Sequence, residues 1–290
     1  MQWSDALGKP HDRYRGKPRI VSLVPSLTEL VVALDLAEEL VGRTGFCIHP
    51  RQAVRRVPKV GGTKGFDVGK LRALQPTHVL VNIDENRREE VETLSSFVPH
   101  LIVTHPLTAH DNIELYRLLG GVFGRETQAA ALCADFERAW TALDGYSASL
   151  PRRRVLYLIW RDPWLGVARD TYISHMLAAA GWDTLPLASS VRYPAIDLPL
   201  LAREAELVFL SSEPYPFRAQ HRRQLATLLP DTRIELIDGE MVSWYGSRAI
   251  AGLDYLRELR TQLEEGPQPP GPGQSAADGS PHAILGSPIS

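Results

Sequence analysis

One uninterrupted helical stretch constrains this chain more than any other feature. Residues 125–144 contain neither glycine nor proline, and at 1.5 Å per residue such a helix is about 30 Å long. Its apolar residues recur at the spacing of a single helix face: Leu132, Phe136, Trp140 and Leu143. We expect the helix to end at Gly145. With short apolar strands and helical patterns on both sides, it is either a stiff bridge between two α/β lobes or one packed crossover helix of a single large domain.

Composition excludes several classes of protein. The chain has 290 residues and a net charge of −2, so nothing favours nucleic acid or an anionic membrane as its partner. No apolar run approaches the length of a membrane span, so we expect no membrane insertion. The first residues lack the apolar segment of a secretory signal, which predicts a cytoplasmic protein, or a periplasmic one if a leader was removed. Its two cysteines, Cys47 and Cys133, do not predict a disulfide.

A weak internal duplication favours two lobes over one sheet. Asp67-x-x-x-Leu71 precedes an apolar strand at 78–83, and Asp197-x-x-x-Leu201 precedes a second at 207–211. The predicted division of the chain is a flexible N-terminal arm (1–18), an N-terminal α/β lobe (19–123), the connecting helix (124–149), a C-terminal α/β lobe (150–263) and a disordered tail rich in proline, glycine and serine (264–290).

Ligands of open α/β sheets bind outside the carboxyl ends of the strands. The second lobe places large aromatic residues in loops there, which indicates a binding wall for a large, flat or partly apolar ligand, although some of these rings can instead cap the core. These residues are Trp160, Trp164, Tyr193, Tyr215, Phe217, Trp244 and Tyr245. The corresponding loops of the first lobe contain Pro25, Ser26, Phe46, Cys47, His49, Thr63, Lys64, Asp84, Glu85 and Asn86.

Several of these residues have two interpretations. Cys47-x-His49 is a possible pair of metal ligands, or else a buried small side chain and a loop histidine. Lys64 is either an anion contact or a solvated lysine, and Arg248 either an anion contact or a helix-start residue. The acids from Asp84 onward are most simply a solvated helix start. Pro25 is followed by Ser26-x-x-Glu29, which predicts a capping box.

The sequence contains no recognisable catalytic motif. It lacks the G-x-S-x-G elbow, the G-x-G-x-x-G fingerprint and any obvious pair of carboxylates. We therefore expect a binding protein and not an enzyme.

Several segments resemble the helical-backbone metal receptor superfamily, the clamp-like solute-binding proteins for vitamin B12, ferric siderophores and haem. The matching segments are RIVSLVPSLTEL (19–30), VGRTGFCIHP (41–50), VPKVGGTKGFDVGKLRALQPTHVLVN (57–82) and DGEMVSWYGSRAIAGLDYL (238–256), together with the long helix. The resemblance is closest to the cobalamin-binding branch. It implies two Rossmann-like lobes joined by a single rigid backbone helix, with the ligand in the cleft between them and little closure on binding.

Carried over by position, the resemblance implies a cobalamin-like ligand with an altered site. Thr63 and Tyr193 stand where B12 binders have tryptophans, and His49 stands in place of a ligand-facing aromatic. A histidine facing the cleft suits an axial bond to cobalt or iron. The implied ligand-binding residues are Pro25, Ser26, Phe46, His49, Thr63, Lys64, Trp160, Trp164, Tyr193, Tyr215, Trp244, Tyr245 and Arg248, with His49 and Cys47 as metal candidates.

A further departure concerns transport. Family members that deliver ligand to an ABC permease carry one exposed glutamate on each lobe, and near those positions this chain has Gly69 and Leu198-Pro199. We therefore expect a monomeric binding protein that stores or hands on a corrinoid or related metal chelate, without docking to a permease. The alternatives are a haem or ferric-siderophore component of an ABC uptake system, which should show more cations in the cleft, and a metal-dependent enzyme or corrinoid-processing factor that uses Cys47 and His49.

Overall fold

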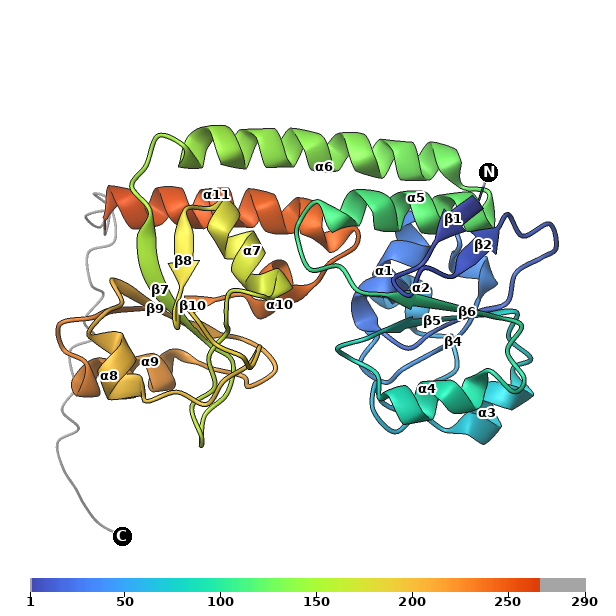
Figure 1. Ribbon diagram of the computed structural model, residues 1–290, viewed down its shortest axis with the longest axis horizontal. Coiled ribbons are helices and arrows are strands. Elements are labelled where there is room, and N and C mark those ends of the chain that lie inside the picture. Colours follow the sequence, from blue (N-terminus) through green and yellow to red (C-terminus); the bar gives the residue numbers. More distant parts are fainter. Residues whose placement is uncertain (1, 267–290) are drawn as a thin grey trace, which may run out of the picture.

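The computed structural model describes residues 2–266, which form two lobes side by side beneath one long helix (Figure 1). That helix, α6 (Glu126–Ser147), extends over both lobes and is the only covalent connection between them. The expectation that Gly145 ends it is wrong. A Cβ at Gly145 would meet no other atom within 4 Å, and Ser147 beyond it is buried, so packing carries the helix through a residue of poor helix propensity.

The first lobe is an open parallel sheet covered by helices. Its strands are β3 (Ile20–Ser22), β4 (Leu40–Arg43), β5 (His78–Asn82) and β6 (His100–Thr104), in the order β4-β3-β5-β6. Its helices are α1 (Pro25–Ala33), the 3-10 helix η1 (Ala37–Glu39), α2 (Arg51–Val54), α3 (Val68–Ala73), α4 (Arg88–Leu94) and α5 (Asp111–Phe123). Every residue of β5 is buried, as a central strand with helices on both faces requires.

The second lobe repeats this topology. Its strands are β7 (Arg153–Leu158), β8 (Trp182–Thr184), β9 (Leu207–Ser211) and β10 (Arg233–Ile237), in the order β10-β9-β7-β8. Its helices are α7 (Tyr172–Ala179), α8 (Leu198–Ala202), α9 (Ala219–Leu228), α10 (Gly239–Ser243) and α11 (Arg248–Glu265). Numbered within its own lobe, each sheet has the order 2-1-3-4. The sequence echo marks equivalent helix starts, since Asp67 caps α3 and Asp197 caps α8 through side-chain hydrogen bonds.

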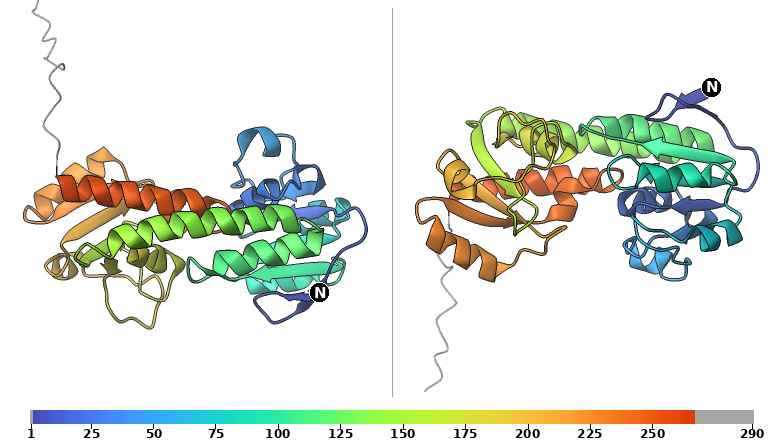
Figure 2. Two further views of the ribbon diagram at one scale, coloured as in Figure 1. Left: turned by 90° about the horizontal axis from the view of Figure 1, so that it is seen from above. Right: turned by 60° about the horizontal axis from the view of Figure 1, so that its bottom comes forward.

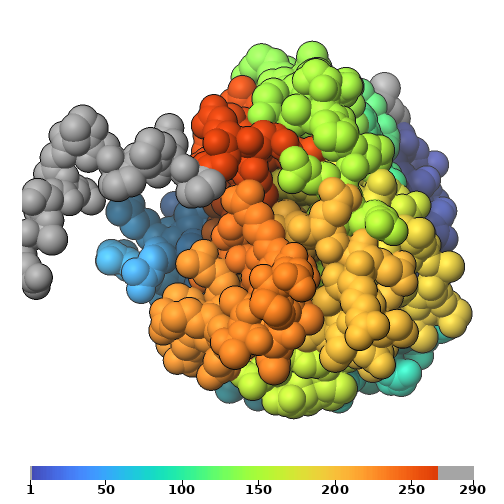
Figure 3. All heavy atoms as spheres, turned by 90° about the vertical axis from the view of Figure 1, so that its left-hand side faces the viewer, coloured from blue at the N-terminus to red at the C-terminus, as the bar shows by residue number. Residues whose placement is uncertain are grey.

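The connecting helix packs on both lobes. Seen from above, α5 and α11 lie along opposite halves of α6 (Figure 2), and the end-on view shows α6 and α11 together covering one side of the second lobe (Figure 3). Phe136 and Leu143 are fully buried, whereas Leu132 and Trp140 pack partly buried against the same core. The predicted apolar stripe of α6 is confirmed.

Hydrogen bonds brace the two lobes where they meet. The backbone N–H of Gly246, in the second lobe, donates to Asn112 Oδ1 at 2.6 Å, and the Tyr116 hydroxyl donates to the Gly246 carbonyl at 2.8 Å. Asn112 Nδ2 also donates to the Tyr172 hydroxyl at 3.0 Å. Because Asn112 and Tyr116 are on α5, these buried bonds fix the first lobe against the loop before α11 and against α7.

The N-terminal arm is not loose. β1 (Gln2–Ser4) and β2 (Pro10–Asp12) form an antiparallel hairpin that lies against the first lobe through the buried Asp5 and the partly buried Trp3. Asp5 Oδ2 accepts from the backbone N–H of Val103 at 3.2 Å and lies 3.1 Å from His11 Nε2. Trp3 packs where a side chain at Gly121 would stand, since a Cβ there would be 2.0 Å from its ring. The expectation of a flexible arm is therefore wrong for residues 2–12, because polar composition does not reveal these long-range contacts.

Two further local predictions are wrong. Ser26 does not cap α1, which starts at Pro25 with Val24 at its N-cap and no side-chain cap. The expected capping box fails because Ser26 lies inside the helix, and Glu29 pairs with Arg248 of the second lobe. The predicted tail (264–290) lies outside the described residues except at its start, where α11 continues to Glu265. Between residues 2 and 266, no helix combines the length and apolar character needed to cross a bilayer.

Candidate functional site

A cavity of about 720 Å³ lies between the lobes, at the carboxyl ends of the strands of both sheets. Its wall on the first lobe comes from the loops after β3, β4, β5 and β6. Its wall on the second lobe comes from the loops after β7, β8, β9 and β10 and from the start of α7. The lining residues are Pro25, Gly45, Phe46, Ile48, Thr63, Lys64, Asn82, Asp84, Glu85, Pro106, Ile159, Tyr172, Ile173, Tyr193, Glu213, Pro214, Glu240, Ser243, Trp244 and Tyr245. This size is within the range of small-molecule sites.

Seven of the residues expected to bind ligand line this cavity: Pro25, Phe46, Thr63, Lys64, Tyr193, Trp244 and Tyr245. Phe46 and Tyr193 are 63% and 38% exposed, which is unusual for large aromatic side chains. Phe46 comes from the first lobe and Tyr193 from the second. Together they offer apolar ring faces to a flat ligand held between the lobes.

Three other predicted aromatics lie outside the cavity lining. Trp164 stacks on Phe217, with ring centroids 6.1 Å apart and planes 4° apart, and packs against the core of the second lobe together with Tyr215. Trp160 is 41% exposed and meets Tyr215 edge-on at 5.7 Å. These rings therefore cap the second lobe, the alternative considered from the sequence.

Arg248 lies at the start of α11 and neutralises carboxylates of both lobes. Its guanidinium donates to Glu29 at 2.8 and 3.1 Å and to Glu240 at 3.0 Å, and it lies 4.6 Å from the centre of the Trp244 ring. His49 extends this network, with Nε2 3.6 Å from Glu240 Oε2 and its ring edge-on to Trp244 at 5.9 Å. Arg248 is thus both a helix-start residue and an anion contact, but its anions belong to the protein.

Cys47 and His49 do not converge on one point. The Cys47 side chain is fully buried, with Sγ 3.1 Å from Thr44 Oγ1 and 4.0 Å from the carbonyl of Ser22. Burial raises the pKa of its thiol, against smaller opposing effects of nearby hydroxyls and Arg43. Within residues 2–266, no three His, Cys, Asp or Glu side chains are grouped so as to hold a metal ion. The structure therefore places Cys47 in the core and His49 beside the cavity.

The expectation of a solvated helix start is confirmed for Glu89 and Glu90 but wrong for Asp84 and Glu85. Helix α4 begins only at Arg88, with Glu89 and Glu90 in its first turn, whereas Asp84 and Glu85 line the cavity. The backbone N–H of Asp84 donates to Asn82 Oδ1 at 2.8 Å, and this turn directs the chain toward the second lobe before the helix starts.

Asp84 forms an ion pair across the cleft. Its carboxylate binds the guanidinium of Arg192 from the second lobe and lies 3.4 Å from His105 Nε2. The same arginine donates through Nε to the carbonyl of Asp170 at 2.8 Å. The loop that carries Tyr193 is thereby held against the first lobe at the edge of the cavity.

Sequence reasoning missed the acids of the second lobe. Glu213 follows β9 and Glu240 opens α10, and both line the cavity. Glu213 fits because Gly239 has no side chain: a Cβ there would lie 2.6 Å from Glu213 Cγ. One sequence signal for Glu213 was present. It closely follows strand β9, as Glu85 closely follows the equivalent strand β5, so both acids are expected at the carboxyl ends of the sheets.

The two unpaired acids of the cavity have raised pKa values. The pKa of Glu85 is about 7, because of its burial first and then the charges of Glu213 and Asp84, with Lys64 opposing them. Burial also raises the pKa of Glu213, although hydrogen bonds from Ser243 and Trp244 partly offset the effect. Both shifts favour the neutral form of the carboxyl groups.

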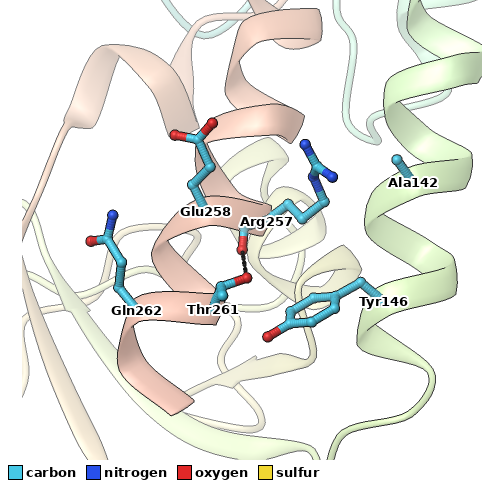
Figure 4. Close-up of a pocket in the computed structure, with 6 residues that line it drawn as sticks. All are labelled: Ala142, Tyr146, Arg257, Glu258, Thr261 and Gln262. Carbon is cyan, nitrogen blue, oxygen red and sulfur yellow. Dashed lines mark hydrogen bonds between the residues drawn. The ribbon is translucent and has the colours of Figure 1, made fainter. Parts of the chain in front are cut away.

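A second hollow of about 500 Å³ lies between α6 and α11 (Figure 4). Its lining is Ala142, Tyr146, Arg257, Glu258, Thr261 and Gln262. The Thr261 hydroxyl donates to the carbonyl of Arg257, one turn earlier in the same helix, at 2.9 Å. This polar groove is not at the strand ends, and we assign the candidate ligand site to the inter-lobe cavity.

Comparison with solved structures gives the same architecture. The periplasmic vitamin B12-binding protein of Vibrio cholerae superposes with a TM-score of 0.74 and 16% identity, over 86% of this chain and 98% of that one. The periplasmic haem-binding protein of Roseiflexus sp. RS-1, in its apo form, superposes with a TM-score of 0.73 and 21% identity, over 84% and 98%. The two-lobe fold with one connecting helix is confirmed.

Sequence comparison identifies relatives and the family. A vitamin B12-binding protein of Vibrio parahaemolyticus is 23% identical over 194 residues, which are 67% of this chain and 70% of the relative. One from Photorhabdus laumondii is 22% identical over 202 residues, 69% and 73% of the two chains. The family model described as periplasmic binding protein matches residues 20–213. This chain therefore belongs to the periplasmic binding protein family.

Proposed function

We propose that this chain is a non-catalytic binding protein for a corrinoid of the vitamin B12 type, held in the inter-lobe cavity. Relatives named as vitamin B12-binding proteins support the ligand class. Phe46, Tyr193 and Trp244 supply ring faces for a large flat ligand. The family name points to the periplasm, the second of the two compartments considered from the sequence.

The charge of the cavity is the observation that carries this proposal. Its lining includes four carboxyl groups, on Asp84, Glu85, Glu213 and Glu240, against the single cation Lys64. The nearby Arg192 and Arg248 are already paired with acids of the protein. Haem and most ferric siderophores are anionic and would need free cations, whereas the periphery of a corrinoid carries mainly neutral amides.

Haem remains the second candidate, because several solved relatives of this fold are haem-binding proteins. The two candidates are separated by parallel calorimetric titrations with hydroxocobalamin and with haemin. Micromolar or tighter binding of hydroxocobalamin, with haemin at least tenfold weaker, is the expected result. Binding of haemin alone would refute the corrinoid assignment.

We further propose that His49 is the candidate axial ligand of the bound metal. Its ring is beside the cavity, and its present neighbour Glu240 is also bound to Arg248, so the imidazole can leave Glu240 without unpairing that carboxylate. The visible bands of hydroxocobalamin should shift on binding to the wild type but not to His49→Ala. His221→Ala, outside the cavity lining, is the matched control. An unchanged shift in His49→Ala would exclude coordination and leave the carrier role intact.

An enzyme or corrinoid-processing factor that uses Cys47 is the alternative from another class. The buried thiol and its raised pKa both oppose a nucleophilic or metal-binding role. We expect Cys47→Ala to bind corrinoid as the wild type does. A loss of more than tenfold in affinity, with stability unchanged, would favour this alternative.

We also propose that this protein hands its ligand on without the family's paired glutamate contacts. Gly69 lies on α3 and Leu198-Pro199 opens α8, at the positions where the resemblance implies docking acids. The expected result is no stimulation of ATP hydrolysis by a B12 permease in proteoliposomes. Stimulation by the corrinoid-loaded protein would contradict this.

A further inference from the structure

Two carboxyl groups in the cavity lack any cationic partner. Neither Glu85 nor Glu213 forms an ion pair within residues 2–266, and the Glu85 carboxyl has no hydrogen bond to another part of the described chain. One oxygen of Glu213 accepts from Ser243 Oγ at 2.7 Å and from Trp244 Nε1 at 2.8 Å. These two bonds fix the side chain in one orientation.

The other two acids of the cavity show the contrast. Asp84 is paired with Arg192 and lies beside His105, and Glu240 is paired with Arg248 and lies beside His49. Two of the four cavity acids are thus paired with arginines of the protein. The other two, Glu85 of the first lobe and Glu213 of the second, are available to a partner from the ligand.

Buried hydroxyl groups adjoin the same site. Tyr245 lines the cavity and is 5% exposed. Burial and then the charge of Glu85 raise the pKa of Tyr245, and interactions with the buried hydroxyls of Ser26 and Thr104 partly offset the effect. The wall beside Glu85 is therefore polar as well as aromatic.

We propose that Glu85 and Glu213 determine ligand specificity by accepting hydrogen bonds from the amide N–H groups, or a positive charge, at the rim of the bound metal chelate. This inference rests on the proposed function of the cavity and extends it to the chemistry of the ligand's periphery. A ligand whose rim carries primary amides supplies a donor to each lobe at once. A ligand whose rim carries carboxylates places like charges against both glutamates.

The charges around the two glutamates carry an electrostatic cost that such a ligand would relieve. Burial, followed by the charges of Glu213 and Asp84, raises the pKa of Glu85. Burial, followed by the charges of Glu240 and Asp238, raises the pKa of Glu213. Lys64 opposes the shift only for Glu85. Because an ionised carboxylate accepts hydrogen bonds more strongly than a neutral one, an amide-bearing ligand should bind more tightly as the pH rises through about 7.

The test compares cyanocobalamin with its monocarboxylate derivatives, in each of which one peripheral amide has become an acid. Affinities are measured by calorimetry at pH 6 and pH 8. We expect the wild type to prefer cyanocobalamin over at least one monocarboxylate by about tenfold to a hundredfold at pH 8, the worth of one or two charge-assisted hydrogen bonds. The preference should be smaller at pH 6, and it should fall severalfold in Glu85→Gln and in Glu213→Gln.

Matched controls remove the same charge away from the cavity. Glu89→Gln and Glu204→Gln alter exposed glutamates of α4 and of the turn after α8 and should keep the wild-type preference and pH profile. If a cavity variant fails to fold, the wild-type preference for cyanocobalamin and its pH dependence still test the role of the two glutamates.

The outcomes separate this inference from the proposed function. Tight binding of cyanocobalamin with no discrimination against any monocarboxylate, or with discrimination unchanged in both Gln variants, overturns the role of the glutamates and leaves the corrinoid function standing. Failure of the wild type to bind any corrinoid, with or without binding of haemin, overturns both.

Discussion

The histidine beneath the N-terminal hairpin should make this protein lose stability in mild acid. His78 is 1% exposed. It stacks on His100, with ring centroids 4.7 Å apart, and meets Tyr14 and Phe123 edge-on, each at 4.8 Å. Burial, followed by the charges of His100 and His11, lowers the pKa of His78 from 6.5 to about 3. The folded protein therefore holds this imidazole neutral.

The sign and size of the effect follow from linkage. Below pH 6.5 the unfolded chain takes up a proton that folded His78 refuses, so stability is lost as the pH falls from 6.5 to about 3. Each pH unit in that window costs about 1.4 kcal/mol. Between pH 7 and pH 5 this single group should lower the free energy of unfolding by about 2 kcal/mol.

Urea unfolding followed by circular dichroism at the two pH values measures this loss. With a denaturant slope of about 3 kcal/mol per molar, the loss moves the midpoint by about 0.7 M. His78→Phe keeps a ring in the stack but does not titrate, so its midpoint should move less than that of the wild type by this amount. Thr77→Val removes the hydrogen bond to His78 Nδ1 and should lower the midpoint equally at both pH values. An equal acid shift in wild type and His78→Phe would refute the reasoning.

Three further variants test the braces between the lobes, the cavity wall and the helix packing. Arg248→Met removes the guanidinium partner of Glu29 and Glu240 and should lower the free energy of unfolding by about 3 kcal/mol. A loss within error in chemical denaturation would contradict this. Tyr193→Ala should weaken corrinoid binding about tenfold in calorimetry without destabilising the fold, whereas Leu228→Ala, 71% exposed, should change neither. Gly252→Ala would place a Cβ 2.2 Å from the backbone oxygen of Met241 and should cost about 2 kcal/mol in urea unfolding, despite alanine's better helix propensity; a gain in stability would refute the close approach.

The sequence predicted the framework because its signals are local. The apolar spacing of Leu132 and Phe136 is a property of one helix, and the strands expected at 78–83 and 207–211 are short, largely apolar runs. The β8 edge strand at 182–184 has only three residues, and the segment 165–168 forms only isolated bridges at Leu165. Short edge segments carry little periodic signal, so tertiary pairing decides which of them becomes a strand.

The sequence identified aromatic residues and the cation Lys64 of the candidate site, but not the arrangement of its acids. Aromatic residues in loops stand out in a sequence, and Phe46, Tyr193 and Trp244 were identified in this way. Whether an acid faces solvent or a cavity depends on partners that are distant in the chain. Arg192 and Asp84 are 108 residues apart, and no sequence pattern around Asp84 predicts that contact.

By itself, then, the sequence determined the helix, most of the strands, the repeated lobes and the family resemblance, since each is encoded in the order of neighbouring residues. Only the tertiary structure determined which charged side chains pair with one another. Arg248 and Glu29 are 219 residues apart, and they meet because folding brings the start of α11 against α1. The same packing leaves Glu85 and Glu213 without a cation. The identity of the ligand depends on this balance of paired and unpaired charge, which exists only after the two lobes have come together.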